Sequence, residues 1–167
     1  MTDITSYRDV YNDLTREQLV KLSSNFSNLV LSPLSILTLL AIAADAANGK
    51  TREEILNYLS EGGETKDLIK TIASIGDFLG KDKALNSANA VCIRKDLEDK
   101  VVPEYPKRLK EIFDGELFSS DDIVTEVNRW VKGKTKGMIE EILDEKQSAL
   151  EARRDPSGGL FDVGRRR

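Results

Sequence analysis

The sequence predicts an α+β protein with about six helices and only a few, separated strands. Three observations support this class. Long segments place apolar residues three and four positions apart, several of these segments begin with a capping residue, and only short runs alternate as strands do. At 167 residues, 40% hydrophobic and 32% charged, the chain is long enough for one soluble domain with a core.

The first quarter of the chain predicts a helix, a short strand and a second helix. Thr15–Gln18 has capping-box spacing, so a helix is expected from there to about Ser23. Asn28–Leu31 is typical of a short buried strand. A helix over 34–47 should follow, with Ser32 as N-cap and Pro33 at its first position. This helix is apolar almost all round, which indicates a place at the centre of a sizeable protein.

The next segments predict two amphipathic helices. Asn48-Gly49 should end the apolar helix, because both residues tolerate the left-handed conformation. A second capping box, Thr51–Glu54, predicts a helix with Ile55, Leu56 and Leu59 facing inward. Gly62-Gly63 is expected to be a turn, and 65–79 a further amphipathic helix.

The remaining pattern predicts two strands and two helices. Residues 85–93 alternate as a strand does, with small residues on one face. Pro103 should start a helix whose apolar residues are Tyr105, Leu109, Ile112 and Phe113, and 115–118 should form a short strand. Asp121-Asp122 should cap the last clear helix, whose inward residues are Ile123, Val127, Trp130 and Val131. Two or three isolated strands cannot form a stable sheet alone, so further residues are expected to complete the sheet.

The composition excludes several kinds of site. Histidine is absent and Cys92 is the single cysteine, so no internal disulfide, catalytic His pair or His-ligated metal can form. The carboxylate pairs lack a nucleophile, a phosphate loop or metal spacing; these pairs are Glu53-Glu54, Asp121-Asp122 and Glu140-Glu141. We therefore expect no enzyme, no metal and no cofactor. The acidic body also disfavours nucleic acid and anionic membranes as partners.

No secretory signal or membrane span is expected. The N-terminal residues lack a basic segment followed by an apolar one, and the apolar stretch 36–47 is too short to cross a bilayer. A cytoplasmic location is favoured. An extracellular one stays open, because a processed chain would look the same.

Four blocks, in order, resemble the serpins (serine protease inhibitors) over roughly 12–143. Asn28-x-x-x-Ser-Pro-x-Ser35 resembles the start of helix B, and Ala46–Thr51 the turn before helix C. Ala88-Asn-Ala90 resembles the strand after helix D. The most specific block, Val127-Asn-x-Trp-Val131 with Thr135-x-Gly-x-Ile139, resembles helix F and the segment leaving it. The resemblance implies helices A to F and the first strands of an incomplete antiparallel sheet.

Serpins trap serine or cysteine proteases with a reactive loop near the C-terminus, which inserts into the main sheet after cleavage. No such loop is found in this chain. The resemblance therefore implies a truncated family member, whose intact form inhibits proteases while this chain alone does not. The alternative is a free-standing helical interaction module built on the same frame. Self-association through unpaired strands is also open.

The resemblance places Ser32, Pro33 and Ser35 in the shutter region, where the sheet parts during insertion. A simple helix cap is the competing interpretation. Asn128, Trp130, Thr135 and Gly137 fall on helix F and the following segment, where we favour structural roles: Trp130 in the core and the polar residues as bonded anchors.

Three further residues and the C-terminal end have ordinary interpretations. Lys66 and Lys70 lie on the helix that some serpins use for polyanions, but Asp67 and Asp77 interrupt the patch and favour a solvated face. Cys92 is expected to be an inert core thiol. The serpin-like part is expected to be 1–143, whereas 144–167 is arginine-rich, off-pattern and typical of disorder. A shifted reading frame or a truncated gene is our hypothesis for this change.

Overall fold

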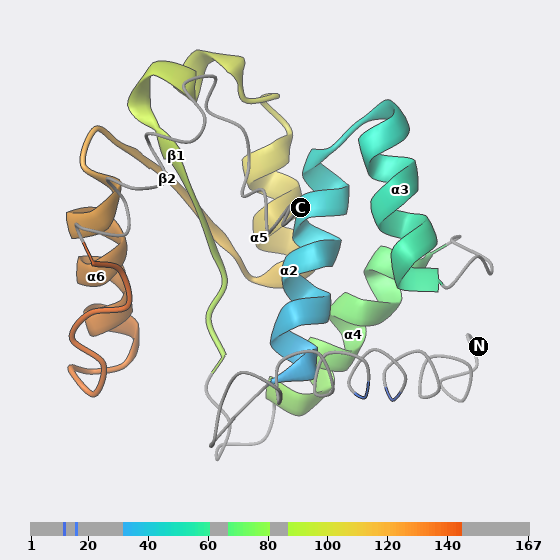
Figure 1. The fold of residues 1–167 in the computed structure, drawn as a ribbon, viewed down its shortest axis with the longest axis horizontal. Coiled ribbons are helices and arrows are strands. Elements are labelled where there is room, and N and C mark those ends of the chain that lie inside the picture. The colour runs from blue at the N-terminus through green and yellow to red at the C-terminus, as the bar shows by residue number, and fades with distance from the viewer. Residues whose placement is uncertain (1–11, 13–15, 17–31, 61–66, 81–86, 145–167) are drawn as a thin grey trace, which may run out of the picture. The chain divides into compact units, whose positions relative to one another are not determined.

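The structure, a computed structural model, describes residues 12, 16, 32–60, 67–80 and 87–144 (Figure 1). Asn12 and Arg16 are helical. The strand expected at 28–31, the turn at Gly62-Gly63 and the tail from 145 lie outside these residues. The described elements are, in order, α2 Pro33–Ala46, α3 Gly49–Ser60, α4 Leu68–Gly80, β1 Ala90–Arg94, the 3-10 helix η1 Lys95–Lys100, α5 Tyr105–Phe113, β2 Glu116–Ser120 and α6 Ile123–Lys134.

The chain divides into two compact units. The first comprises Met1–Ala90 with Val102–Glu116, and the second Val91–Val101 with Leu117–Arg167. Helices α2 to α5 therefore belong to the first unit, while η1, α6 and nearly all of β1 and β2 belong to the second.

Helix α2 is the central helix of the first unit, as its apolar sequence predicts. It packs against α3, α4 and α5. Its buried residues are Leu37, Thr38, Ala41, Ile42 and Ala44. Burying one leucine or isoleucine side chain contributes about 1.5–3 kcal/mol, so this face contributes substantially to the stability of the unit. One apolar side chain, Leu39, stays 62% exposed.

The C-terminal end of α2 is held by arginines from two other helices. The last turn of α2 contains no basic residue of its own. Arg52 of α3 donates to the carbonyl of Ala44, and Arg108 of α5 donates to the carbonyl of Asp45 over 3.2 Å. Arg108 also donates to the Asp45 carboxylate over 3.1 Å. These guanidinium groups satisfy carbonyls that the helix leaves free and complement the negative end of its dipole.

Helix α3 begins earlier than its sequence predicts. Thr51 was expected to be the N-cap, but α3 starts at Gly49, so the capping-box assignment is wrong. The reason is the backbone of Gly49, whose φ of +57° reverses the chain immediately after α2. The predicted inward face is confirmed, with Leu59 fully buried and Ile55 and Leu56 half-buried.

Helices α4 and α5 bury the apolar faces that their spacing predicts. Both begin two or three residues later than expected, at Leu68 and Tyr105. The buried side chains are Leu68, Ile69 and Ile72 in α4, and Tyr105, Leu109 and Phe113 in α5. Fraying of terminal turns makes such shifts of boundary common.

The turn after α5 requires a glycine. Asp114 ends the helix in the left-handed conformation, with φ of 49°. The N–H of Gly115 then donates to the Leu109 carbonyl over 3.1 Å. A β-carbon on Gly115 would lie 2.8 Å from Cδ1 of Leu109, a distance that a real β-carbon does not adopt. The close approach delays the second strand by one residue, so β2 starts at Glu116 instead of Gly115.

Strands β1 and β2 pair in a two-stranded sheet. The N–H of Glu116 donates to the Asn89 carbonyl over 3.0 Å, so the two strands begin at the same end. Figure 1 shows both running in the same direction. The expectation of antiparallel strands is therefore wrong for this pair. The reason is the connection: η1 and α5 carry the chain back to the start of β1, as a crossover between parallel strands requires.

Candidate functional site: the α2 cap and the α6 latch

The start of α2, here called the α2 cap, consists of Ser32, Pro33 and Ser35. The Ser32 hydroxyl accepts a hydrogen bond from the Ser35 backbone N–H over 3.4 Å. The two serine hydroxyl oxygens lie 2.8 Å apart, and Pro33 occupies the first turn. The predicted N-cap is thus confirmed. Both serines are exposed, and their assignment to a shutter region stays a prediction.

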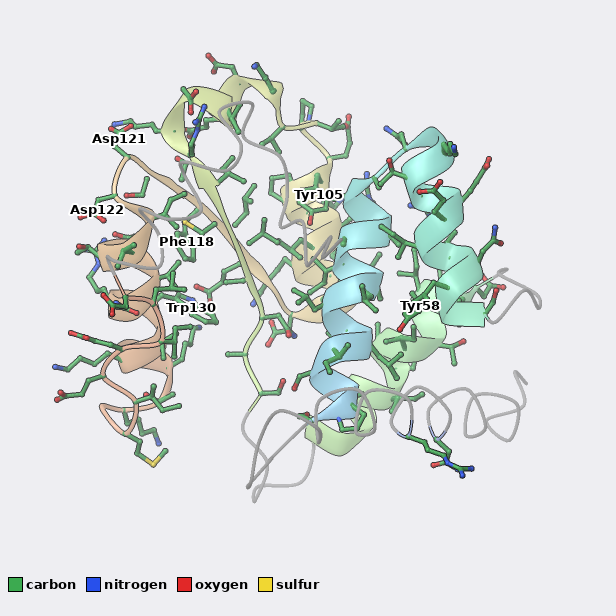
Figure 2. All side chains as sticks on the ribbon, viewed as in Figure 1. Tyr58, Tyr105, Phe118, Asp121, Asp122 and Trp130 are labelled. Carbon is green, nitrogen blue, oxygen red and sulfur yellow. The ribbon has the colours of Figure 1, made fainter. Side chains whose placement is uncertain are left out.

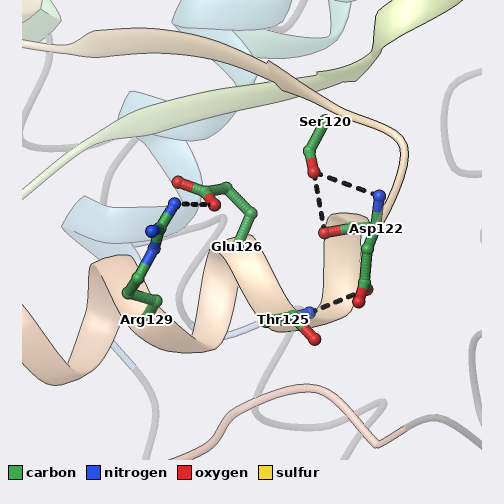
Figure 3. A network of polar contacts seen from close by, with 5 residues as sticks. All are labelled: Ser120, Asp122, Thr125, Glu126 and Arg129. Carbon is green, nitrogen blue, oxygen red and sulfur yellow. Dashed lines mark hydrogen bonds and ion pairs between the residues drawn. The ribbon is translucent and has the colours of Figure 1, made fainter.

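The start of α6 is capped as its sequence predicts (Figure 3). Asp122 is the N-cap, and its Oδ1 accepts from the Thr125 N–H over 3.1 Å. The Asp122 N–H donates to the Ser120 hydroxyl oxygen over 3.0 Å. The hydrogen bonds from the Thr125 side chain and backbone hold the pKa of Asp122 below its usual value. Glu126 and Arg129 form an ion pair one turn further on.

The inward face of α6 carries one fully buried residue, Val131, at 6% exposure. Trp130 is half-buried. Its ring centroid lies 6.3 Å from that of Phe118, with the two planes tilted by 37° (Figure 2). Such a tilted pair is favourable, so Trp130 fixes α6 to its neighbouring strand. The Lys134 ammonium lies 5.8 Å from the Trp130 ring centroid on the same helix.

The end of α6 turns the chain back sharply. Lys136 adopts a left-handed φ of 53°, and Gly137 a φ of 81°. The Gly137 N–H donates to the Lys132 carbonyl over 2.8 Å, and the Lys136 N–H to the Gly133 carbonyl over 3.3 Å. These two bonds form a Schellman motif, with Lys136 in the place that glycine usually takes.

The segment 136–144, here called the return segment, is anchored by two polar side chains of α6. The Asn128 amide donates to the Leu143 carbonyl over 2.9 Å. Its oxygen accepts from the N–H groups of Ile142 and Leu143, over 2.9 and 3.0 Å. The Thr135 hydroxyl accepts from the Ile139 N–H over 3.1 Å and lies 2.9 Å from the Val131 carbonyl. We call Asn128, Thr135 and Gly137 the α6 latch.

Asn128 and Thr135 both make hydrogen bonds to backbone groups, as the interpretation of these residues as polar anchors requires. The latch satisfies backbone groups of a segment that has no helix or strand of its own. Lys132 and Glu140, 3.7 Å apart, add an exposed ion pair between α6 and the return segment. The arrangement has no chemistry of its own and acts by fixing the course of the backbone.

The latch leaves three apolar side chains of the return segment exposed. Met138 is 81% exposed, Ile139 45% and Ile142 53%. Because Asn128 and Thr135 hold the backbone on either side, these side chains are presented at fixed positions. We call these three residues the apolar triplet. Large exposed apolar side chains on one short segment are a feature of surfaces that another segment or partner covers.

The remaining predicted residues have ordinary surroundings. Lys70 is exposed and lies 3.9 Å from Asp67, which agrees with a solvated face; Lys66 lies outside the described residues. Cys92 is half-buried. Burial raises the pKa of its thiol, and the nearby Glu126 carboxylate raises that pKa further. The thiol therefore stays protonated at neutral pH, as an unreactive cysteine does.

Two kinds of feature are absent from the described part of the chain. None of its helices has the length and apolar character that a membrane crossing needs. Within the same residues, no group of three or more Cys, Asp or Glu side chains is placed to hold a metal ion.

Sequence reasoning missed the anchors that depend on distant partners. Asn89, which precedes β1, donates from its side chain to the Phe113 carbonyl at the end of α5 over 3.0 Å. Arg52 and Arg108 hold the end of α2. Asn89 belongs to the Ala88-Asn-Ala90 block, which does not indicate its partner. No local signal distinguishes either arginine from a solvated one.

The two groups of predicted site residues lie in different units. The α2 cap belongs to the first unit, and the α6 latch with Trp130 to the second. The structure thus gathers Asn128, Trp130, Thr135 and Gly137 on one helix and its return segment, and the three α2 residues on another helix.

Comparison with known proteins identifies the family. The family model described as Serpin (serine protease inhibitor) matches residues 9–152. A serine protease inhibitor from Mus musculus is 31% identical over 131 residues, which are 71% of this chain and 31% of that protein. Serpin-ZX from Arabidopsis thaliana is 27% identical over 154 residues, covering 85% of this chain and 38% of the plant protein.

A solved structure shows the same fold. The Arabidopsis AtSerpin1 structure in its native stressed conformation superposes with a TM-score of 0.73 at 24% sequence identity. The superposition covers 87% of this chain and 40% of that one. The described part is therefore an incomplete α+β serpin fold, and the chain spans 31% and 38% of the lengths of the two relatives above. With most of its residues matched by the family model, the chain belongs to the serpin family.

Proposed function

We propose that this chain supplies the N-terminal frame of a protein that inhibits serine or cysteine proteases by inserting a reactive loop into its main sheet. The observation that carries the proposal is the family match over residues 9–152. Members of this family generally inhibit proteases. The matched region corresponds to 40% or less of each compared relative, and we place the reactive loop in the remaining part of such a protein.

We further propose that the α2 cap and the α6 latch are fixed points of that frame. Loop insertion requires a sheet to open while its surroundings keep their shape. The Ser32–Ser35 contact fixes the first turn of α2, and the three hydrogen bonds of Asn128 fix the return segment on α6. The Ser32–Ser35 contact stays within the first turn of α2, and Asn128 makes three of its four possible hydrogen bonds, which suits a frame better than a moving part.

The test mixes residues 1–167 with trypsin, chymotrypsin, elastase and papain. The expected result is full protease activity and no covalent complex on a denaturing gel, because residues 1–167 contain no reactive loop. Serpin-ZX, an intact relative, serves as the positive control. Joining residues 1–143 to the C-terminal part of that relative should restore complex formation. A complex formed by residues 1–167 alone, or an inactive hybrid that is nevertheless folded, would contradict the proposal.

A second candidate function is a free-standing interaction module. The exposed apolar triplet favours it, because the latch presents these side chains at fixed positions. This candidate requires a monodisperse chain with one cooperative melting transition and little binding of hydrophobic dyes. An incomplete inhibitor frame instead predicts dye binding and association. Size-exclusion chromatography and a thermal melt of residues 1–167 distinguish the two.

A further inference from the structure

The junction between α2 and α3 contains the one Asn-Gly dipeptide in the sequence, Asn48-Gly49. Asn48 is exposed, and Gly49 has a φ of +57°. A β-carbon placed on Gly49 would meet nothing within 4 Å. Both reacting groups of an asparagine side-chain cyclisation are therefore adjacent, exposed and uncrowded.

The reaction at such a dipeptide is a balanced loss of ammonia. The backbone nitrogen of Gly49, after losing its proton, attacks Cγ of Asn48, and a C–N bond closes a five-membered succinimide. The C–N bond to the side-chain amide breaks, and the amide nitrogen leaves as ammonia after taking up a proton. Water then opens either carbonyl of the ring, which gives aspartate or isoaspartate. The net change is one water consumed and one ammonia released, without oxidation or reduction.

The described hydrogen bonds leave this nitrogen available. Gly49 is the first residue of α3, and the first N–H groups of a helix have no partner inside it. Among the hydrogen bonds of the described residues, none involves the Gly49 N–H or the Asn48 side chain. We propose that Asn48 is a site of spontaneous deamidation, which places an aspartate or isoaspartate at the α2–α3 junction.

Three other asparagines of the described residues have surroundings that should slow deamidation. Asn57 is exposed, as Asn48 is, but Tyr58 follows it inside α3, where the backbone N–H is bonded within the helix. Asn89 and Asn128 donate from their amide nitrogens to backbone carbonyls over 3.0 and 2.9 Å. Each is followed by a residue with a β-carbon, which hinders the attack on Cγ. These three serve as internal references.

The surroundings of Asn48 accommodate the product. A carboxylate at this position precedes the N-terminus of α3, where the helix dipole favours negative charge. Isoaspartate also lengthens the backbone by one methylene, in a link of only two residues between α2 and α3. The lengthened link adjoins the Arg52–Ala44 hydrogen bond, so we expect the end of α2 to loosen after conversion.

The test incubates the full chain of 167 residues at mildly alkaline pH, alongside a peptide of residues 44–54 as an unfolded reference. Mass spectrometry of tryptic peptides locates the converted residue by fragment ions, and isoaspartyl methyltransferase labelling detects isoaspartate. We expect Asn48 to convert at a rate within a few-fold of the peptide, while Asn57, Asn89 and Asn128 stay amides. The Asn48→Gln variant should stay unlabelled at this position.

Two results would overturn the proposal. The first is retention of the Asn48 amide in the folded chain after the reference peptide has converted. The second is conversion of Asn57 as fast as Asn48, which would show that exposure alone decides the rate. Neither result depends on whether the protein inhibits a protease.

Discussion

At the scale of single residues, Asn128 holds the return segment through its side chain alone. Its amide uses three of the four hydrogen bonds that an asparagine side chain can make. All three go to the backbone of Ile142 and Leu143, which lie 14 and 15 positions further along the chain. Without this side chain, these backbone groups could bond only to water, because the return segment belongs to no helix or strand that would supply backbone partners.

We therefore expect Asn128→Ala to lower the free energy of unfolding by about 1–3 kcal/mol, the cost of unmade hydrogen bonds at a half-buried site. Urea denaturation measures this loss. Hydrogen exchange should also accelerate at the amides of Ile142 and Leu143. The matched control is Arg129→Ala, which removes only an exposed ion pair worth about 0.2–1 kcal/mol. Equal effects of the two substitutions would argue against the latch.

Asp122 makes the stability of α6 depend on pH. Hydrogen bonds from Thr125 lower the pKa of Asp122 in the folded chain below its unfolded value. A carboxyl of this kind stabilises the fold fully above the unfolded pKa. That contribution disappears as the pH falls through the lowered, folded pKa, because the protonated carboxyl is a weaker acceptor.

Asp122→Asn tests this dependence, since asparagine is an equally good N-cap but does not titrate. We expect both proteins to have similar stability near neutral pH. As the pH falls from neutral through the lowered pKa of Asp122, the variant should lose less stability than the wild type. Urea unfolding of both proteins across this range measures the difference. Parallel curves would show that the Asp122 carboxylate contributes nothing in its charged form.

At the scale of elements, the end of α2 depends on α3 and α5. A helix terminus leaves four carbonyls without partners inside the helix. In α2, Arg52 and Arg108 reach two of these carbonyls from neighbouring helices. Arg108 also pairs with the Asp45 carboxylate, whose side chain is only 9% exposed. Packing of α5 against α2 and satisfaction of the α2 terminus are therefore coupled.

Arg108→Leu should lower the free energy of unfolding by about 1–3 kcal/mol, less than a fully buried pair would, because the Arg108 side chain is 40% exposed. Adding Asp45→Asn should recover part of the loss, since no unpaired buried carboxylate then remains. A double-mutant cycle by urea denaturation measures this coupling. Lys107→Leu, which removes an exposed pair with Glu111, is the control. Additive effects at Asp45 and Arg108 would contradict the coupling.

At the scale of the whole molecule, the chain forms two units with an incomplete sheet. A two-stranded sheet is marginally stable alone, and β1 and β2 are half-buried along nearly their whole length. The apolar triplet adds exposed surface to the second unit. Both features favour association with other chains or segments.

We expect residues 1–167 to associate as concentration rises, and the double substitution Met138→Gln with Ile142→Gln to reduce that association. The reason is the loss of exposed apolar area, and α6 should stay as stable as before. Sedimentation velocity over a range of concentrations measures the effect. Glu141→Gln, exposed on the same return segment, should leave association unchanged or increase it. Unchanged association of the double variant would exclude the apolar triplet as its cause.

Local signals predicted much of the fold and part of the candidate site. Ser32 and Asp122 cap α2 and α6, and their partners lie three residues away, within reach of a sequence argument. The apolar spacing also identified the buried faces of α3 to α6. The predicted N-cap of α3 at Thr51 is wrong, because the left-handed conformation of Gly49 starts the helix two residues earlier than the capping-box spacing indicates.

The sequence by itself determined the helix caps, the apolar faces and the family, because these depend on residue types a few positions apart. Only the tertiary structure decided the direction of β2, the arginines at the end of α2 and the partners of Asn128. Each of these depends on which segments pack together. The Asp45–Arg108 contact joins residues 63 positions apart, and no periodicity within a single helix encodes such a pairing.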